Sequence, residues 1–283
     1  MIRKSIGTQT LQTWLSAATK QLKAADIASA RLDVEIILAH TLRKNRTYLH
    51  AHSDDILEPR VQEIADARLS LRLDHVPIAY IVGFKEFYGR RFSVTTDTLI
   101  PRPESEAIID SLKEHLAGNV TPANGTRLRL IDVGTGSGCL GITAKLEFPE
   151  LEVTLADISP PALMVATANA KQLHADVTIL ESDVLHDFPT QTDIILANLP
   201  YVDSVWEVSP DTIHEPSVAL FAGNGGLALI YKLIDQSMAV LSSQGLLLLE
   251  ADPRQHHLIV GYANQRGFNL VSKQDYCLTL RRV

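Results

Sequence analysis

The sequence predicts an α/β protein in which a small all-α segment precedes a mostly parallel β-sheet covered by helices on both faces. Two observations support this prediction. Residues 1–75 repeat apolar side chains at three- and four-residue steps, and no glycine occurs between Gly7 and Gly83. Past residue 126, short apolar runs typical of buried strands alternate with stretches typical of helices. The length of 283 residues is enough for two domains of average size.

The first 75 residues predict a small helical bundle. Apolar positions indicate helices over residues 11–22, 32–42 and 59–73, and Pro59 stands where the first turn of the third helix begins. A bundle with one apolar stripe on each helix is typical of a docking or scaffolding domain without chemistry of its own. We therefore expect an N-terminal helical domain over residues 1–75.

Residues 76–104 predict a linker. Aromatic and β-branched residues bounded by glycines over residues 76–94 suggest a hairpin or two short strands. Pro101 and Pro103 then impose an extended path, and a helix is expected to begin near Ser105. The second domain is accordingly expected over residues 105–283.

The second domain shows the alternation of strands and helices that produces a parallel sheet. Helices are expected from about residue 140 to Pro149 and over residues 162–173. The last eight residues resemble a further strand, which would give the sheet an antiparallel edge. The other expected strands span residues 127–133, 153–157, 177–180, 193–198 and 245–250.

Composition excludes several classes of protein. The formal net charge is −7, and residues 101–283 hold 12 Lys and Arg against 22 Asp and Glu, which disfavours a phosphate backbone as partner. No apolar run approaches the roughly 20 residues that cross a bilayer, and the start lacks the apolar core of a secretion signal. Cys139 and Cys277 lack zinc-site spacing. We expect an intracellular soluble protein without a metal or a disulfide.

A glycine-rich turn follows the first expected strand of the sheet, at residues 132–138, Asp-Val-Gly-Thr-Gly-Ser-Gly. Such a turn lets the backbone approach a ligand closely at the carboxyl end of a strand. Asp157, which ends the next strand, is placed to accept hydrogen bonds from two ribose hydroxyls. Asp132 is a poor neighbour for a pyrophosphate but a good one for an ammonium and a sulfonium. The turn therefore favours S-adenosylmethionine over a dinucleotide.

Asp183 and Val184 follow the third expected strand of the sheet. The carboxylate is placed to accept a bond from an adenine amino group, and the valine to pack on the adenine ring. An ordinary surface turn would have the same composition, so these two residues alone leave both readings open.

The fourth strand ends in Asn198-Leu199-Pro200-Tyr201. Methyl transfer to a planar nitrogen needs two acceptors on its two N–H bonds, which hold the group in line with the methyl donor. The Asn198 side-chain oxygen and the Leu199 carbonyl supply these acceptors. Pro200 directs the turn, and Tyr201 offers a flat face for a planar amide or base. The tetrapeptide therefore predicts methylation of such a nitrogen.

The chain resembles the N5-glutamine methyltransferases that modify peptide chain release factors, the HemK/PrmC family, over nearly its full length. The segments that support the resemblance are residues 77–83, 86–89, 99–104, 132–138, 198–201, 214–216, 219–220 and 225–227. The resemblance implies a helical N-terminal domain, a hairpin linker and a Rossmann-like, seven-stranded class I methyltransferase domain. The implied substrate is the glutamine in the Gly-Gly-Gln tip of a release factor.

The resemblance also implies site residues and partners. Asn198, Leu199, Pro200 and Tyr201 would hold the glutamine. The expected partners are release factors, and neither a stable nucleic-acid complex nor a membrane is expected. The enzyme is expected to be monomeric and cytoplasmic. We assign no general base. The expected cofactor site comprises Asp132, Gly134, Thr135, Gly136, Ser137, Gly138, Asp157, Asp183, Val184 and Asn198.

Three positions depart from the family pattern and leave alternatives open. Leu199 replaces the first proline of Asn-Pro-Pro-Tyr, Val184 replaces an aromatic residue, and His214 replaces a tyrosine. The Asn-Leu-Pro-Tyr form is similar to adenine-N6 methyltransferases that act on RNA or DNA. A ribosomal-protein glutamine methyltransferase and a catalytically silent cofactor-binding module are the remaining alternatives.

Overall fold

The computed structural model describes residues 9–117, 127–186 and 188–283. The chain forms two compact units. The smaller holds the residues up to Gly83 together with Ser209–His214, and the larger holds Phe84–Val208 and Glu215–Val283. Every helix in the described part of the chain is too short or too polar to span a bilayer.

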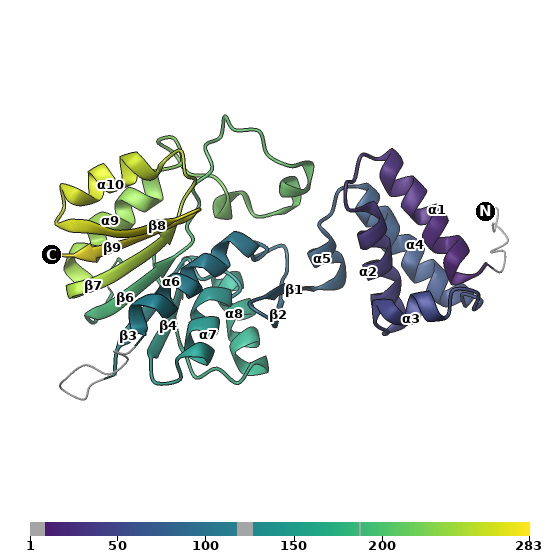
Figure 1. Cartoon of the computed structure of the whole chain (residues 1–283), viewed down its shortest axis with the longest axis horizontal. Coiled ribbons are helices and arrows are strands. Elements are labelled where there is room, and N and C mark those ends of the chain that lie inside the picture. Colours follow the sequence, from purple (N-terminus) through teal and green to yellow (C-terminus); the bar gives the residue numbers. More distant parts are fainter. Residues whose placement is uncertain (1–8, 118–126, 187) are drawn as a thin grey trace. The chain divides into compact units, whose positions relative to one another are not determined.

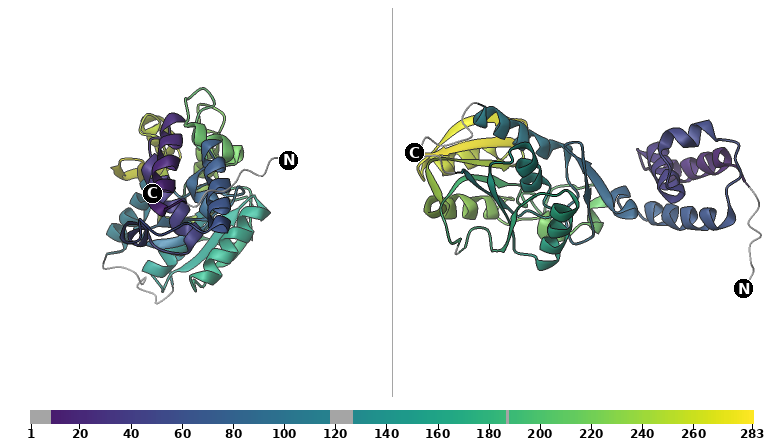
Figure 2. Two further views of the ribbon diagram at one scale, coloured as in Figure 1. Left: turned by 90° about the vertical axis from the view of Figure 1, so that its right-hand side faces the viewer. Right: turned by 90° about the horizontal axis from the view of Figure 1, so that it is seen from below.

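The smaller unit is helical, as its apolar periodicity predicts (Figures 1 and 2, purple to blue). The Thr10 side chain caps the first helix, the Asn45 side chain caps the third, and Pro59 opens the fourth. The predicted spans are confirmed, and a short helix at residues 46–51 adds to them. The helices are α1 (Leu11–Ala24), α2 (Ala30–Leu42), α3 (Arg46–Ala51), α4 (Pro59–Leu73) and α5 (Ile78–Val82).

A buried arginine binds the segment Ser209–His214 into the helical unit. Arg72 on α4 is 5% exposed, and its Nε donates to Asp33 Oδ2 at 2.7 Å. Its Nη2 lies 3.0 Å from Asp211 Oδ2. Buried charges persist when they are paired and hydrogen-bonded, so this carboxylate–guanidinium–carboxylate arrangement explains why a segment distant in sequence belongs to this unit.

The linker segment contains the expected hairpin, preceded by a short helix that the sequence did not predict. Residues 78–82 form α5, which ends at Gly83 with a φ of +80°, and the hairpin comprises only β1 (Phe84–Phe87) and β2 (Arg90–Ser93). The sequence Pro77-Ile-Ala-Tyr-Ile-Val-Gly is short and apolar, so periodicity alone does not separate a buried helix from a strand. The division at Gly83 consequently assigns α5 to the helical unit and the hairpin to the larger unit, whereas the sequence predicted a boundary at residue 75.

The larger unit contains, within its described residues, a sheet of seven strands in the order β5-β4-β3-β6-β7-β9-β8 (Figure 1). The first five in this order pair in parallel, and β9 pairs antiparallel with both of its neighbours, β7 and β8. The predicted seven-stranded sheet is confirmed. The strands are β3 (Arg129–Val133), β4 (Glu152–Asp157), β5 (Thr178–Glu181), β6 (Thr192–Ala197), β7 (Leu241–Glu250), β8 (Phe268–Gln274) and β9 (Cys277–Arg282).

The C-terminal strand is not the edge of the sheet. Strand β9 lies between β7 and β8, and the edge is β8, which the sequence analysis did not identify. Only Phe268 of β8 is buried, so its apolar pattern is too weak to predict a strand. The predicted C-terminal strand and its antiparallel pairing are confirmed, but tertiary pairing with β9 creates a further strand, so β8 and not β9 lies at this edge.

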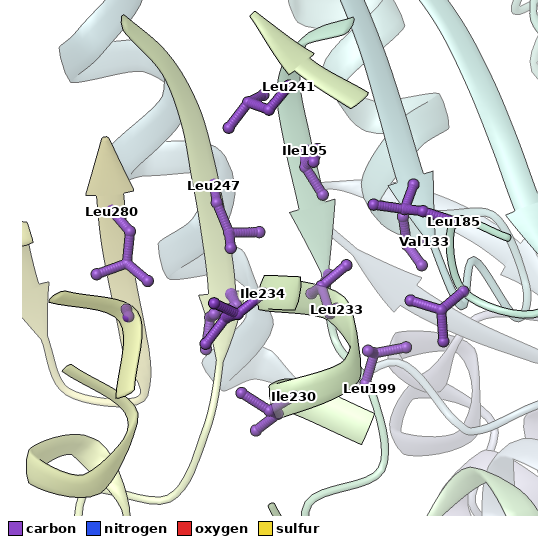
Figure 3. Close-up of a cluster of buried hydrophobic side chains, with 14 of the residues drawn as sticks. Val133, Leu185, Ile195, Leu199, Ile230, Leu233, Ile234, Leu241, Leu247 and Leu280 are labelled. Carbon is purple, nitrogen blue, oxygen red and sulfur yellow. The ribbon is translucent and has the colours of Figure 1, made fainter. Parts of the chain in front are cut away.

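Alternate residues of the central strands enter two separate cores. On β6, Ile194 and Leu196 face a core shared with α6 (Glu106–Leu116), α7 (Cys139–Glu147) and α8 (Pro160–Gln172). Ile195 and Ala197 face a core shared with α9 (Ala228–Val240) and α10 (His256–Asn264). Figure 3 shows this second core, in which Leu233 and Ile234 of α9 lie near Ile195 and Leu247. Burial on both faces explains the continuous apolar runs of these strands.

Candidate active site

The glycine-rich turn connects β3 to α7 and forms part of the wall of a cavity of about 330 Å³. Gly134 has a φ of +69°, and a Cβ there would lie 2.7 Å from Leu199 Cδ2. A glycine is therefore required where the turn approaches the tetrapeptide at 198–201. A Cβ on Gly136 would meet no atom within 4 Å, because the turn faces open space at that point.

Asp132 lies behind the turn, not in the cavity wall. It is 1% exposed, and its Oδ2 accepts from Thr135 Oγ1 at 2.6 Å and from the Gly141 amide at 2.8 Å. Burial raises the pKa of this carboxyl to about 6. In this structure Asp132 thus holds the turn against α7, which differs from the expectation that it faces a ligand directly.

Asp157 at the end of β4 lines the cavity. Its Oδ2 accepts from the Gly136 amide at 2.9 Å, and its Oδ1 accepts from the Ser159 amide at 2.9 Å. Both carboxylate oxygens are fixed by backbone donors while each keeps a further lone pair. The carboxylate is consequently oriented to accept two hydroxyl groups.

Asp183 and Val184 line the cavity after β5. Asp183 Oδ2 accepts from Lys232 Nζ at 2.6 Å, an exposed contact on α9. Val184 is buried with a φ of +60°, and the Ser182 hydroxyl, at 3.1 Å from the Val184 carbonyl, bonds this turn. A positive φ is unusual for a β-branched residue, so the surrounding structure holds the backbone of Val184 in an uncommon conformation.

The tetrapeptide follows β6, and Asn198, Leu199 and Pro200 line the cavity. Asn198 Nδ2 donates to Ser105 Oγ at 2.8 Å. This leaves the Asn198 Oδ1 to accept a hydrogen bond from an N–H group of a substrate. The Tyr201 hydroxyl donates to Glu250 Oε1 at 2.8 Å, and Tyr201 lines a second, more open concavity. Burial raises the pKa of Tyr201, and the neighbouring Glu250 carboxylate raises it further, so the phenol stays protonated.

Two segments that are far apart in the sequence meet at the cavity. Arg102 lines it, and its Nη2 donates to Glu215 Oε1 at 2.5 Å, while Glu215 Oε2 accepts from the Ile100 amide at 3.2 Å. The carboxylate of Glu215 is buried. This ion pair joins the segment around Arg102 to the segment around Glu215.

The structure brings most of the predicted site together. Gly138 and Tyr201, like Asp132, do not line the cavity. Ser105 and Glu250, which bond Asn198 and Tyr201, were not among the predicted site residues, although the position of Glu250 at the carboxyl end of a strand was a detectable signal. The predicted residues that do line the cavity are Gly134, Thr135, Gly136, Ser137, Asp157, Asp183, Val184, Asn198, Leu199 and Pro200.

Comparison with known proteins gives the family. A family model described as the PrmC N-terminal domain matches residues 13–83, and one described as the methyltransferase small domain matches residues 105–257. The release factor glutamine methyltransferase of Koribacter versatilis (strain Ellin345) is 37% identical over 268 residues, which cover 90% of this chain and 92% of that protein. This chain belongs to the release factor glutamine methyltransferase family. The family's protein from Deinococcus radiodurans is 31% identical, with 94% of both chains covered.

Solved structures agree on the fold of this family member. A methyltransferase from Pyrococcus furiosus has a TM-score of 0.50 at 16% identity and covers 76% of this chain and 95% of its own. The 16S rRNA N2 G1207 methyltransferase of Thermus thermophilus, solved with AdoMet and guanosine, has a TM-score of 0.50 at 16% identity and covers 70% of this chain and 49% of its own. At this identity the likeness concerns the fold alone.

The chemistry of the cavity fits the cofactor of a methyltransferase, S-adenosylmethionine, which supplies the methyl group. Asp97, Asp157 and Asp183 lie in the wall. Among the described residues of the wall the basic side chain is Arg102, which is already paired with Glu215. Such a wall suits a ligand that has cationic groups and lacks phosphate. The open space beside Gly136 gives such a ligand room next to the turn.

Proposed function

We propose that this enzyme transfers a methyl group from S-adenosylmethionine to the side-chain amide nitrogen, N5, of the glutamine in the Gly-Gly-Gln motif of peptide chain release factors. The observation that supports it best is the orientation of Asn198. Its Nδ2 is engaged by Ser105 at the edge of the cofactor cavity, so Oδ1 is the end that meets an acceptor N–H. Relatives named for this activity share 31–37% identity over nearly the whole chain.

The tetrapeptide holds the glutamine amide. Asn198 Oδ1 and the Leu199 carbonyl accept its two N–H bonds, which keeps the nitrogen in line with the methyl donor. Tyr201 packs its ring against the planar amide, and its hydroxyl, bound to Glu250, fixes the ring. The side chain of Leu199 is buried in the core on the α9 side of the sheet, and this packing anchors the tetrapeptide where the family pattern has a proline.

The glycine-rich turn and the following acids hold the cofactor. Asp157, fixed by two backbone amides, accepts the ribose hydroxyls. Asp183 accepts the adenine amino group while Lys232 lies at its outer oxygen, and Val184 packs on the ring. Gly134, Thr135 and their neighbours in the turn contact the methionine part through the backbone.

The helical unit serves as the docking domain for the release factor. Among its described residues, no group of three or more His, Cys, Asp and Glu side chains is placed to hold a metal ion. We further propose that the enzyme acts in the cytoplasm, where release factors work, and that it is a monomer.

The second candidate is an adenine-N6 methyltransferase, which Leu199 in Asn-Leu-Pro-Tyr favours. The acidic balance of residues 101–283 opposes it, because nucleic-acid binding depends largely on neutralising phosphates. A glutamine of a ribosomal protein is the remaining alternative substrate for the same tetrapeptide.

The deciding experiment incubates the enzyme and labelled S-adenosylmethionine with each of three methyl acceptors in turn. These are a bacterial release factor, the same factor with its tip glutamine replaced by alanine, and ribosomal RNA. We expect one added methyl on the tip glutamine, located by mass spectrometry, and none on the alanine variant. Label in RNA alone would favour the second candidate, and label on the alanine variant would place the methyl elsewhere.

A further inference from the structure

A single buried carboxylate contacts both ends of the acceptor tetrapeptide. Glu250 ends β7 and is 2% exposed. Its Oε1 accepts from the Tyr201 hydroxyl at 2.8 Å, and its Oε2 accepts from Ser105 Oγ at 2.5 Å. Ser105, 1% exposed, immediately precedes α6 and accepts from Asn198 Nδ2 at 2.8 Å. Three segments separated by up to 145 residues therefore share one hydrogen-bonded chain.

The direction of this chain follows from which groups donate and which accept. When Glu250 is ionised, its carboxylate only accepts, and the one proton of the Ser105 hydroxyl then points to Glu250. The lone pairs of Ser105 Oγ then face Asn198, and only the amino end of the carboxamide donates to them. The oxygen of Asn198 is consequently the end presented to the acceptor. Without this constraint, a side-chain amide reverses by rotation about its last bond at little steric cost.

We propose that Glu250 is a positioning residue which, through Ser105, determines that the Asn198 oxygen and not its amino group faces the acceptor nitrogen. This inference rests on the proposed function, since it explains how Asn198 accepts from the glutamine amide. The same carboxylate fixes the ring of Tyr201, so one group orients both side chains that meet the substrate.

Burial raises the pKa of the Glu250 carboxyl. The hydrogen bonds from Ser105, Tyr201 and Asn198 favour its ionised form and offset only part of that rise. The group is unused by the transfer itself, because it contacts the tetrapeptide from behind and does not line the cofactor cavity. A buried carboxylate that only stabilised the fold would not need to be connected to both Asn198 and Tyr201, the two ends of the tetrapeptide.

The test compares Ser105→Ala with Ser111→Ala. Both remove a buried serine hydroxyl from the larger unit, but Ser111 lies on α6 and bonds Thr279 Oγ1 of β9 at 2.8 Å instead of Glu250 or a residue of the tetrapeptide. We expect Ser105→Ala to lower kcat at least tenfold with the cofactor Kd within twofold, and Ser111→Ala to keep kcat. Equal kcat values for the two variants would overturn the proposal.

Glu250→Gln and Ser105→Thr complete the series. Glutamine keeps the shape of Glu250 but has one acceptor oxygen for two donors, so kcat falls severalfold or more; an unchanged kcat contradicts the proposal. Threonine keeps the hydroxyl, and activity above that of Ser105→Ala supports the relay, whereas an equal loss with a native circular dichroism spectrum contradicts it.

A measurement without substrate separates this inference from the proposed function. The side-chain amide protons of Asn198, assigned by their loss in Asn198→Asp, should exchange with solvent at least tenfold faster in Ser105→Ala than in the unchanged enzyme. Slow exchange in the unchanged enzyme together with no methylation of a release factor would refute the proposed function and leave the relay intact. Fast exchange in both proteins would refute the relay.

Discussion

Gly226 provides a sharp test of how the tetrapeptide is held in place. It precedes α9, and its φ is +82°. A Cβ at this position would lie well inside contact distance of the Tyr201 carbonyl oxygen and 2.5 Å from Gln255 Nε2. Gln255 Nε2 donates to that same carbonyl at 2.9 Å and to the Gly225 carbonyl at 2.8 Å. A methyl group here must displace Tyr201 or the side chain that binds it.

The expected effect of Gly226→Ala has two parts. The left-handed backbone costs a non-glycine residue about 1 kcal/mol, and inserting a methyl group into a packed site costs about 1–3 kcal/mol. We therefore expect the free energy of unfolding to fall by roughly 2–4 kcal/mol. Because displacement of a positioning group by about 1 Å lowers rates by up to about 10²-fold, kcat should fall at least tenfold.

Gly225→Ala is the matched control. Its φ is +66°, so it bears the same backbone cost, but its Cβ would meet no atom closer than Asp203 Oδ2 at 3.8 Å. Urea unfolding followed by circular dichroism, together with methyl-transfer kinetics, compares the two variants. We expect Gly225→Ala to lose about 1 kcal/mol and to keep most of kcat. If both variants lose the same stability and the same kcat, the close approach of Gly226 to Tyr201 has no consequence and the reasoning fails.

Three further predictions concern the proposed site. Asn198→Ala should lower kcat by about 10²-fold and change the cofactor Kd less than threefold, because it removes an acceptor for the transferring nitrogen; calorimetry and steady-state kinetics check this, and a raised Kd with normal kcat contradicts it. Asp157→Ala should raise the cofactor Kd about 10- to 100-fold, since charged hydrogen bonds contribute about 1.5–3 kcal/mol. The control Asp157→Asn keeps an acceptor oxygen and should raise the cofactor Kd less. An unchanged Kd in the alanine variant would remove Asp157 from the site. Burial raises the pKa of Asp132 from 3.8 to about 6, so the folded chain holds this proton more tightly than the unfolded chain. The free energy of unfolding should therefore fall by up to roughly 3 kcal/mol as pH rises from about 4 to 6. Asp132→Asn should remove this pH dependence, and a pH-independent difference in unfolding free energy between the two proteins in urea titrations would contradict it.

The sequence predicted those parts of the site that are local in the chain. The turn at 132–138, the acid at Asp157 and the tetrapeptide at 198–201 each follow a short apolar strand, and the carboxyl ends of parallel strands meet at one edge of a sheet. Their convergence on one cavity therefore follows from periodicity and the parallel topology. Their individual contacts do not, and Asp132 shows this, because its side chain binds Thr135 and Gly141 behind the turn.

Local pattern determined the helices of the smaller unit, the parallel strands and the glycine positions, because hydrophobic spacing and backbone freedom act over a few residues. Tertiary structure alone decided that β8 is the edge strand and that Arg102 pairs with Glu215. It also decided that Glu250 reaches Asn198 through Ser105. A buried polar group must find its partner wherever packing brings one within about 3 Å, and that neighbour is set by the whole fold and not by distance along the chain.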